Sequence, residues 1–179
     1  MSSRDVIILP GGGYPAQAPL LMYAGEAAGR RGGVIRPISW DTPEELLTLT
    51  ADQRGPWVLD QLARGVPDLQ DGSLLIGKSL GTHAAAVAAE RGLPAVWLTP
   101  LLTSQFVVDG LRRSTAPFLL VGGTADTLWD SGVARELTPY VLEVDGADHG
   151  MFVPGRLAAS AAVLGQVATA VEDFLDEIL

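Results

Sequence analysis

The stretch Leu-Leu-Ile-Gly-Lys-Ser-Leu-Gly, residues 74–81, decides the fold that we expect of this chain. It begins with an apolar run of strand length, continues into the pattern G-x-S-x-G and leads into the Ala-rich segment 80–91, which has helical spacing. Small residues on both sides of a serine permit a sharp turn from a strand into a helix. The stretch therefore predicts a strand, a tight turn and a helix, with the hydroxyl of Ser79 exposed at the start of that helix.

Strand-length apolar runs alternate with helical segments along the rest of the chain. The expected strands are residues 6–9, 34–38, 74–76, 95–98, 118–121 and 141–144. The expected helices are residues 20–31, 53–64, 80–91, 104–112, 132–137 and 157–178. This alternation predicts an α/β fold, a doubly wound parallel sheet with helices on both faces, whose ligands bind beyond the carboxyl ends of the strands.

Length, composition and charge narrow the classes of protein that fit this sequence. The chain has 179 residues, and no repeat or linker divides it, so we expect one domain over residues 1–179. A net charge of -9 disfavours a nucleic-acid partner, and the absence of cysteine excludes disulfides and cysteine-ligated zinc. No apolar stretch approaches the roughly 18 residues of a membrane span, and the N-terminus lacks a signal-peptide pattern. We therefore expect a cytoplasmic protein that does not bind membranes.

Residues 72–79, Gly-Ser-Leu-Leu-Ile-Gly-Lys-Ser, also satisfy the P-loop expression G-x-x-x-x-G-K-S. In a P-loop the four middle residues form a loop around phosphate groups, and the strand precedes the first glycine. Here the middle residues belong to the expected strand itself, and an extended strand cannot wrap a phosphate. Nucleotide binding is therefore the less favoured alternative.

Three glycines, Gly11, Gly12 and Gly13, follow the first expected strand. They begin a G-x-G-x-x-A pattern, but Pro15 lacks the amide that a dinucleotide-binding helix needs at its start. Glycines let backbone N–H groups approach a developing negative charge, as an oxyanion-binding loop requires. The alternative is a plain flexible turn.

A serine nucleophile needs an imidazole base, and the chain has two histidines. His83 lies one helical turn after Ser79, where we expect it to pack against its own helix. His149 lies in a polar loop after the last strand, and Asp126 lies in the loop after strand 118–121. Ser79, Asp126 and His149 thus follow three different strands at one edge of the sheet. Asp130 is the backup acid, with capping of the next helix as its alternative role.

These segments resemble the α/β-hydrolase superfamily over nearly the whole chain. The glycine loop, the G-x-S-x-G turn, the Gly-Thr-Ala-Asp126 loop and the Gly-Ala-Asp-His149 loop occur in the order of that superfamily. The resemblance implies six mostly parallel strands in the order 2-1-3-4-5-6. It also implies that the amides of Leu80 and Gly12, with Gly13 as the alternative to Gly12, stabilise an oxyanion. The short connection between residues 98 and 104 leaves no room for a lid, which predicts a shallow, open site.

The resemblance implies a serine hydrolase that cleaves a carboxylic ester or thioester of a small soluble molecule, without cofactor or metal. His149 would take the proton of Ser79, Asp126 would orient the imidazole, and an acyl group would form on Ser79. We expect Lys78 to be a surface residue at the start of the helix. One rival function is a non-catalytic binding domain, whose signature would be an incomplete set of serine, acid and histidine; the sequence does not show it. A second rival is a serine peptidase or a cofactor-free lyase that uses the same residues, which fold and residue set leave open.

Loop positions alone indicate which aromatic and apolar residues line a substrate pocket. A place in the core is the alternative for each of them. The candidates are Tyr14, Trp40, Trp129, Met151 and Phe152.

Overall fold

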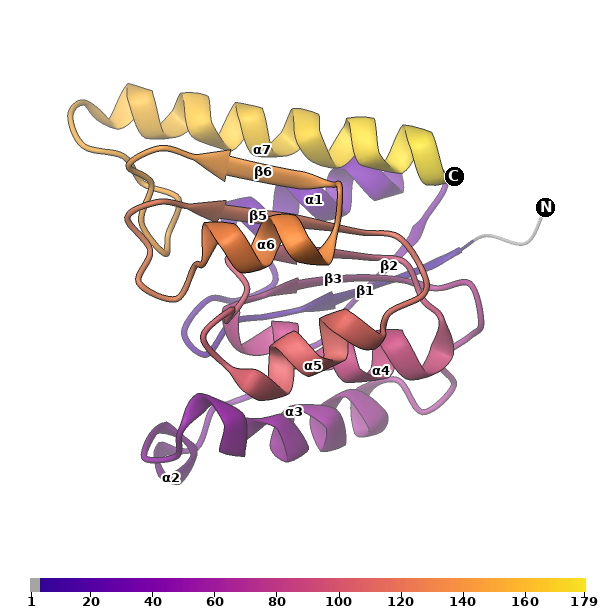
Figure 1. Cartoon of the computed structure of the whole chain (residues 1–179). Helices are drawn as coiled ribbons and strands as arrows, with labels where there is room; N and C mark the ends of the chain where they lie inside the picture. The colour runs from indigo at the N-terminus through magenta and orange to yellow at the C-terminus, as the bar shows by residue number, and fades with distance from the viewer. Residues whose placement is uncertain (1–3) are drawn as a thin grey trace.

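The computed structural model describes residues 4–179, which form one parallel sheet between two layers of helices (Figure 1). The strand order is β2-β1-β3-β4-β5-β6, and each neighbouring pair is parallel. The strands are β1 (Asp5–Leu9), β2 (Val34–Pro37), β3 (Leu74–Lys78), β4 (Ala95–Leu98), β5 (Phe118–Gly123) and β6 (Val141–Val144). This topology confirms the predicted doubly wound α/β sheet and its strand order.

Helices cover both faces of the sheet (Figure 1). One face carries α1 (Pro19–Gly29) and α7 (Leu157–Ile178), which pack against each other. The other face carries α3 (Ala51–Gly65), the 3-10 helix η1 (Ser79–Ala84), α4 (Ala85–Arg91), α5 (Gln105–Arg113) and α6 (Ser131–Leu137). Among the described residues, no helix combines the length and the apolar character needed to cross a membrane.

Strand β1 shows why the apolar runs are continuous rather than alternating. Val6 and Ile8 belong to the core beneath α1 and α7, whereas Ile7 and Leu9 belong to the core on the opposite face. All four side chains are buried, because a parallel sheet is covered on both sides. The carboxyl ends of the central strands consequently open onto loops at one edge of the sheet, and these loops carry the polar residues.

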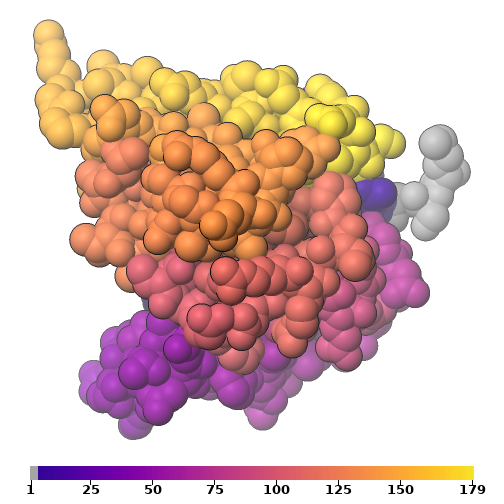
Figure 2. Space-filling view, viewed as in Figure 1, coloured from indigo at the N-terminus to yellow at the C-terminus, as the bar shows by residue number. Residues whose placement is uncertain are grey.

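Three local features differ from the sequence-based expectation. Strand β3 continues through Gly77 and Lys78, and the helix after it begins as the 3-10 helix η1. A single-turn helix, α2 (Glu44–Leu47), precedes α3 and was not predicted, because four residues are too few to show a helical period. Figure 2 shows α2 and the start of α3 in purple at the lower left of the molecule. The segment near residue 155, in gold, lies at the upper left.

Helices α4 and α5 pack closely because Gly110 has no side chain. A Cβ atom at Gly110 would lie 2.8 Å from the amide nitrogen of Ala86 and 3.0 Å from the carbonyl carbon of Ala85. Gly165, in α7, has no atom within 4 Å of the corresponding position. The two helical glycines therefore differ in their surroundings and not in their type of element.

This difference predicts opposite effects of one substitution. Gly110→Ala should lower the free energy of unfolding by about 1–3 kcal/mol, because backbone atoms must move apart. Gly165→Ala should raise it by up to about 1 kcal/mol, since alanine favours a helix. Urea unfolding of both variants checks the prediction, and stabilisation by Gly110→Ala would contradict the packing described here.

Candidate active site

The turn at Ser79 depends on the absence of side chains at two flanking positions. Ser79 has φ = 49°, a left-handed conformation that costs energy for a residue with a side chain. A Cβ atom at Gly81 would lie 2.6 Å from the carbonyl oxygen of Leu9, and one at Gly77 would lie 2.8 Å from the ring of Trp97. The two glycines of the G-x-S-x-G pattern thus permit the close packing that projects Ser79 from the end of β3.

The side chains of Ser79, His149 and Asp126 form one hydrogen-bonded chain. His149 Nε2 lies 2.8 Å from Ser79 Oγ, and His149 Nδ1 lies 2.7 Å from Asp126 Oδ2. The Asp126 side chain is 1% exposed, whereas that of His149 is 36% exposed. The structure therefore brings together the serine, the histidine and the acid that the sequence singled out. Only the outer part of these three hydrogen-bonded side chains is open to solvent.

Asp126 is held in its charged form. Burial by itself raises the pKa of the Asp126 carboxyl group. Hydrogen bonds from His149 and from the amide of Leu128, together with the positive charge of Lys78, outweigh burial and hold the pKa below its usual value. The amide of Leu128 donates to Oδ1 at 2.9 Å, which leaves Oδ2 for His149. This geometry fixes the orientation of the imidazole.

Backbone contacts hold the acid loop against the histidine loop. The amide of Ala125 donates to the carbonyl oxygen of Ala147 at 3.0 Å. The hydroxyl of Thr124 donates to Asp145 at 2.9 Å and accepts from the amide of Gly146 at 2.7 Å. The distance between Asp126 and His149 is thus set by two loops that are fastened to each other.

The second histidine and the backup acid have structural partners. Both ring nitrogens of buried His83 face carbonyl oxygens, that of Leu80 at 2.7 Å and that of Ala51 at 2.6 Å. Asp130 accepts a hydrogen bond from the amide of Val133 at 2.9 Å and caps α6. His83 thus packs where the sequence predicts, and Asp130 takes its alternative role.

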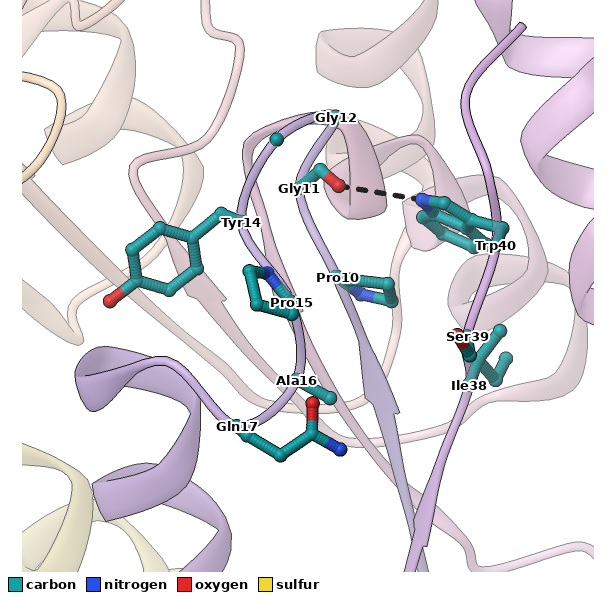
Figure 3. A pocket seen from close by; sticks show the side chains of 11 residues that line it. Pro10, Gly11, Gly12, Tyr14, Pro15, Ala16, Gln17, Ile38, Ser39 and Trp40 are labelled. Carbon is teal, nitrogen blue, oxygen red and sulfur yellow. Dashed lines mark hydrogen bonds between the residues drawn. The ribbon is translucent and has the colours of Figure 1, made fainter.

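The glycine loop turns back at Gly12, with Tyr14 on one side and Trp40 on the other (Figure 3). The amide of Gly11 donates to the carbonyl oxygen of Tyr14 at 2.9 Å, and the carbonyl oxygen of Gly11 accepts from Trp40 Nε1 at 3.4 Å. Gly12 faces the side chain of Leu80, which would lie 3.8 Å from a Cβ atom at Gly12. The loop therefore lies directly beside the residue that follows Ser79.

A cavity of about 210 Å³ opens at Ser79. It lies between the glycine loop, α2, the start of α3 and the loops after β4 and β5. Its lining residues are Gly12, Gly13, Thr42, Leu46, Leu47, Arg54, Ser79, Leu80, Leu101 and Leu128. Sequence reasoning missed the contributions of α2 and α3, because α2 is too short to show a helical period and α3 reaches Ser79 only through the folding of the chain.

Three of the five predicted pocket residues meet at a second cavity, of about 300 Å³. Tyr14, Met151 and Phe152 line it together with the start of α7, and Gly150, next to His149, is part of the same wall. Trp40 instead lines a cavity of about 180 Å³ beside the glycine loop (Figure 3) and stacks edge-on against Trp57. Met151 and Phe152 thus line one cavity and Trp40 another, and Tyr14 lines both.

The prediction that Trp129 lines the pocket is wrong. Its ring occupies the space beside Gly122, where a Cβ atom would otherwise lie, and is buried in the core. The indole Nε1 donates to Glu143 at 2.6 Å, which satisfies its single donor group. The sequence places Trp129 in the loop after β5, but it does not reveal that the side chain folds back onto β5.

The expectation of an exposed Lys78 is also wrong. Lys78 is 3% exposed, because β3 extends through it. Its Nζ donates to the hydroxyl of Thr99 and to the carbonyl oxygen of His149, both at 3.0 Å, and lies 4.6 Å from the centre of the Tyr14 ring. Since three of the four middle residues of the P-loop-like pattern, residues 74–76, are strand and its lysine is engaged in this way, residues 72–79 do not form a phosphate-binding loop.

Burial lowers the pKa of Lys78 from 10.5 to about 8, although the negative charges of Asp126 and Asp148 oppose the shift. The unfolded chain therefore binds more protons than the folded chain between these pH values, and the free energy of unfolding should rise as the pH increases through this window. Lys78 is the only lysine of the chain, so its ¹³C-labelled side chain gives one titrating NMR signal. We expect a midpoint near pH 8. A midpoint above 10 would contradict the burial of the charge.

The fold is that of known hydrolases. No protein-family model matches the chain, and no curated protein matches its sequence. Among solved structures, Est1E from Butyrivibrio proteoclasticus with bound ferulic acid is 16% identical, with a TM-score of 0.70 over 99% of this chain and 90% of that one. A dienelactone hydrolase from Anabaena variabilis is 22% identical, with a TM-score of 0.70 over 99% and 88%. An α/β serine hydrolase without a lid from Xanthomonas campestris is 15% identical, with a TM-score of 0.58 over 97% and 84%. Residues 4–179 therefore have the α/β-hydrolase fold that the sequence resembles.

Proposed function

We propose that this protein is a serine hydrolase that cleaves carboxylic esters or thioesters of small molecules through an acyl-enzyme on Ser79. The hydrogen-bonded chain from Asp126 through His149 to Ser79, at the mouth of a cavity, is the observation that carries the proposal. The similar structures add support, because they include a ferulic-acid-binding Est1E, a dienelactone hydrolase and a serine hydrolase. The fold by itself does not decide the chemistry.

The first half of the reaction forms the acyl-enzyme. Ser79 Oγ attacks the carbonyl carbon of the substrate while His149 Nε2 accepts the hydroxyl proton. Charged Asp126 stabilises the imidazolium that results. The tetrahedral intermediate then expels the alcohol or thiol, which receives the proton from His149 Nε2. The acyl group remains bonded to Ser79 Oγ.

The second half returns the enzyme to its starting state. A water molecule gives a proton to His149 Nε2 and attacks the acyl carbon, and the proton then passes to Ser79 Oγ as the carboxylic acid leaves. In both halves the negative oxygen needs N–H donors. We assign the amide of Leu80 and that of Gly12, with Gly13 as the alternative to Gly12, since these residues lie beside Ser79 in the same cavity.

The two cavities beside the site fit a small substrate that is partly apolar. The cavity lined by Tyr14, Met151 and Phe152 adjoins the histidine loop, so it suits an apolar part of the leaving group. Residues 99–104, between β4 and α5, form a short connection, which supports an open site without a lid over the described part of the chain.

The first test of the proposal removes the nucleophile and the base. Ser79→Ala and His149→Ala should each lower kcat for p-nitrophenyl butyrate and for an acyl thioester by several orders of magnitude, whereas circular dichroism should stay unchanged. Ser114→Ala, whose hydroxyl donates to the carbonyl oxygen of Ala116, is the matched serine control and should keep full activity. Turnover by Ser79→Ala at the wild-type rate would contradict the mechanism.

A second test compares the two acids of one loop. Asp126→Asn should lower kcat by about 10⁴-fold, because an amide cannot hold the imidazole in the required tautomer; this magnitude is that of the corresponding change in a serine protease. Asp130→Asn should keep both activity and stability, since asparagine caps a helix as well as aspartate does. Steady-state kinetics on both variants decide the assignment. Equal losses would show that Asp126 has no special role.

A further inference from the structure

Arg54 is the one charged side chain that lines the cavity at Ser79, and no acidic side chain lines that cavity among the described residues. It lies in the first turns of α3, beside the apolar wall made by Leu46, Leu47 and Leu80. The chain as a whole carries a net charge of -9. Arg54 is therefore the charged group that a ligand in this cavity would meet.

The guanidinium of Arg54 is anchored but still has free donors. Its Nε donates to the carbonyl oxygen of Leu49 and its Nη2 donates to that of Leu47, both at 3.1 Å. A guanidinium has five N–H groups, so these two bonds fix its plane and leave others for a ligand. Within residues 4–179, Arg54 forms no salt bridge, whereas Arg64 on the same helix pairs with Asp60 at 2.9 Å.

The positions of His149 and of the cavity indicate which part of a substrate would reach Arg54. His149 gives its proton to the leaving group, so the alcohol or thiol must lie on the His149 side of the carbonyl carbon. The cavity with Arg54 is lined by Gly12, Ser79 and Leu80 and not by His149. The acyl part therefore enters this cavity and directs its far end toward the guanidinium.

We propose that the cavity selects acyl groups that end in a carboxylate, which Arg54 binds through its free N–H groups. The substrate class is then a monoester or monothioester of a short dicarboxylic acid. This inference rests on the proposed function of Ser79. Leucine side chains of the wall contact the methylene groups between the two carboxyl carbons, and the volume of about 210 Å³ limits their number. An arginine–carboxylate pair is a strong, directional contact, which suits selection between similar acyl groups.

A pair of isosteric esters tests the proposal. Monobenzyl succinate carries the terminal carboxylate, and benzyl succinamate carries a neutral amide of the same shape. We expect the wild-type protein to prefer the anionic ester by about tenfold or more in kcat/KM, as a charge-assisted hydrogen bond predicts. The preference should decrease with ionic strength, since Arg54 is half-buried and not fully enclosed.

Variants of one helix separate binding from folding. Arg54→Gln should reduce the ratio of the two kcat/KM values to about one, and Arg54→Lys should keep part of it. Arg64→Gln removes the same charge from an exposed site on α3 and should leave activity and ratio unchanged. Urea unfolding of each variant reports any loss of the bonds to Leu47 and Leu49. A wild-type ratio near one, or an unchanged ratio in a folded Arg54→Gln variant, would overturn the proposal.

Two further measurements distinguish this proposal from the proposed function. Hydrolysis of p-nitrophenyl acetate by the wild-type protein reports on the proposed function without involving Arg54. Calorimetry on the inactive Ser79→Ala variant reports on carboxylate binding without any hydrolysis. There we expect monobenzyl succinate to bind more tightly than benzyl succinamate, and the difference to vanish when Arg54→Gln is added. Equal binding of both esters would overturn the selection of a carboxylate, whatever the outcome of the hydrolysis assay.

Discussion

The close approach of Gly81 to the end of β1 is the contact on which the rest of the site depends. Because the α-carbon of Gly81 packs against the carbonyl oxygens of Leu9 and Pro10, the turn after β3 and the glycine loop after β1 are pressed together. Ser79, two residues before Gly81, has a left-handed conformation that projects its hydroxyl from the end of β3. One steric constraint thus places the candidate nucleophile beside the backbone amides that would stabilise a negative oxygen.

The buried ammonium of Lys78 links this turn to the histidine loop. Its bonds to Thr99 and to the carbonyl oxygen of His149 connect β3, β4 and the loop after β6 at one point. Removing a charge from water is unfavourable, and the depressed pKa of Lys78 reflects that cost. The hydrogen bonds and the ring of Tyr14 offset part of it, so the fold retains a cation directly behind the Ser79–His149 pair.

Local patterns in the sequence were sufficient to predict the sheet and to single out Ser79, Asp126 and His149, because each of those residues follows a segment of strand length, although Glu143 interrupts the apolar run before His149. The strand order came from a resemblance, and the structure confirms it. The places of Lys78 and Trp129 required tertiary information, since a charged residue can be buried by neighbours from distant segments and an aromatic ring can fold back onto its own strand. Arg54 was missed for a related reason: α2 and α3 approach Ser79 only after the chain has folded.

Mapping the site of covalent labelling is the most direct test of Ser79 as the nucleophile. A fluorophosphonate reacts with a serine whose hydroxyl is activated by a neighbouring base, and peptide mass spectrometry identifies the modified residue. We expect one adduct, on Ser79, that disappears in His149→Ala and persists in His83→Ala. Labelling of Ser104 or Ser131, or no labelling of a folded protein, would contradict it.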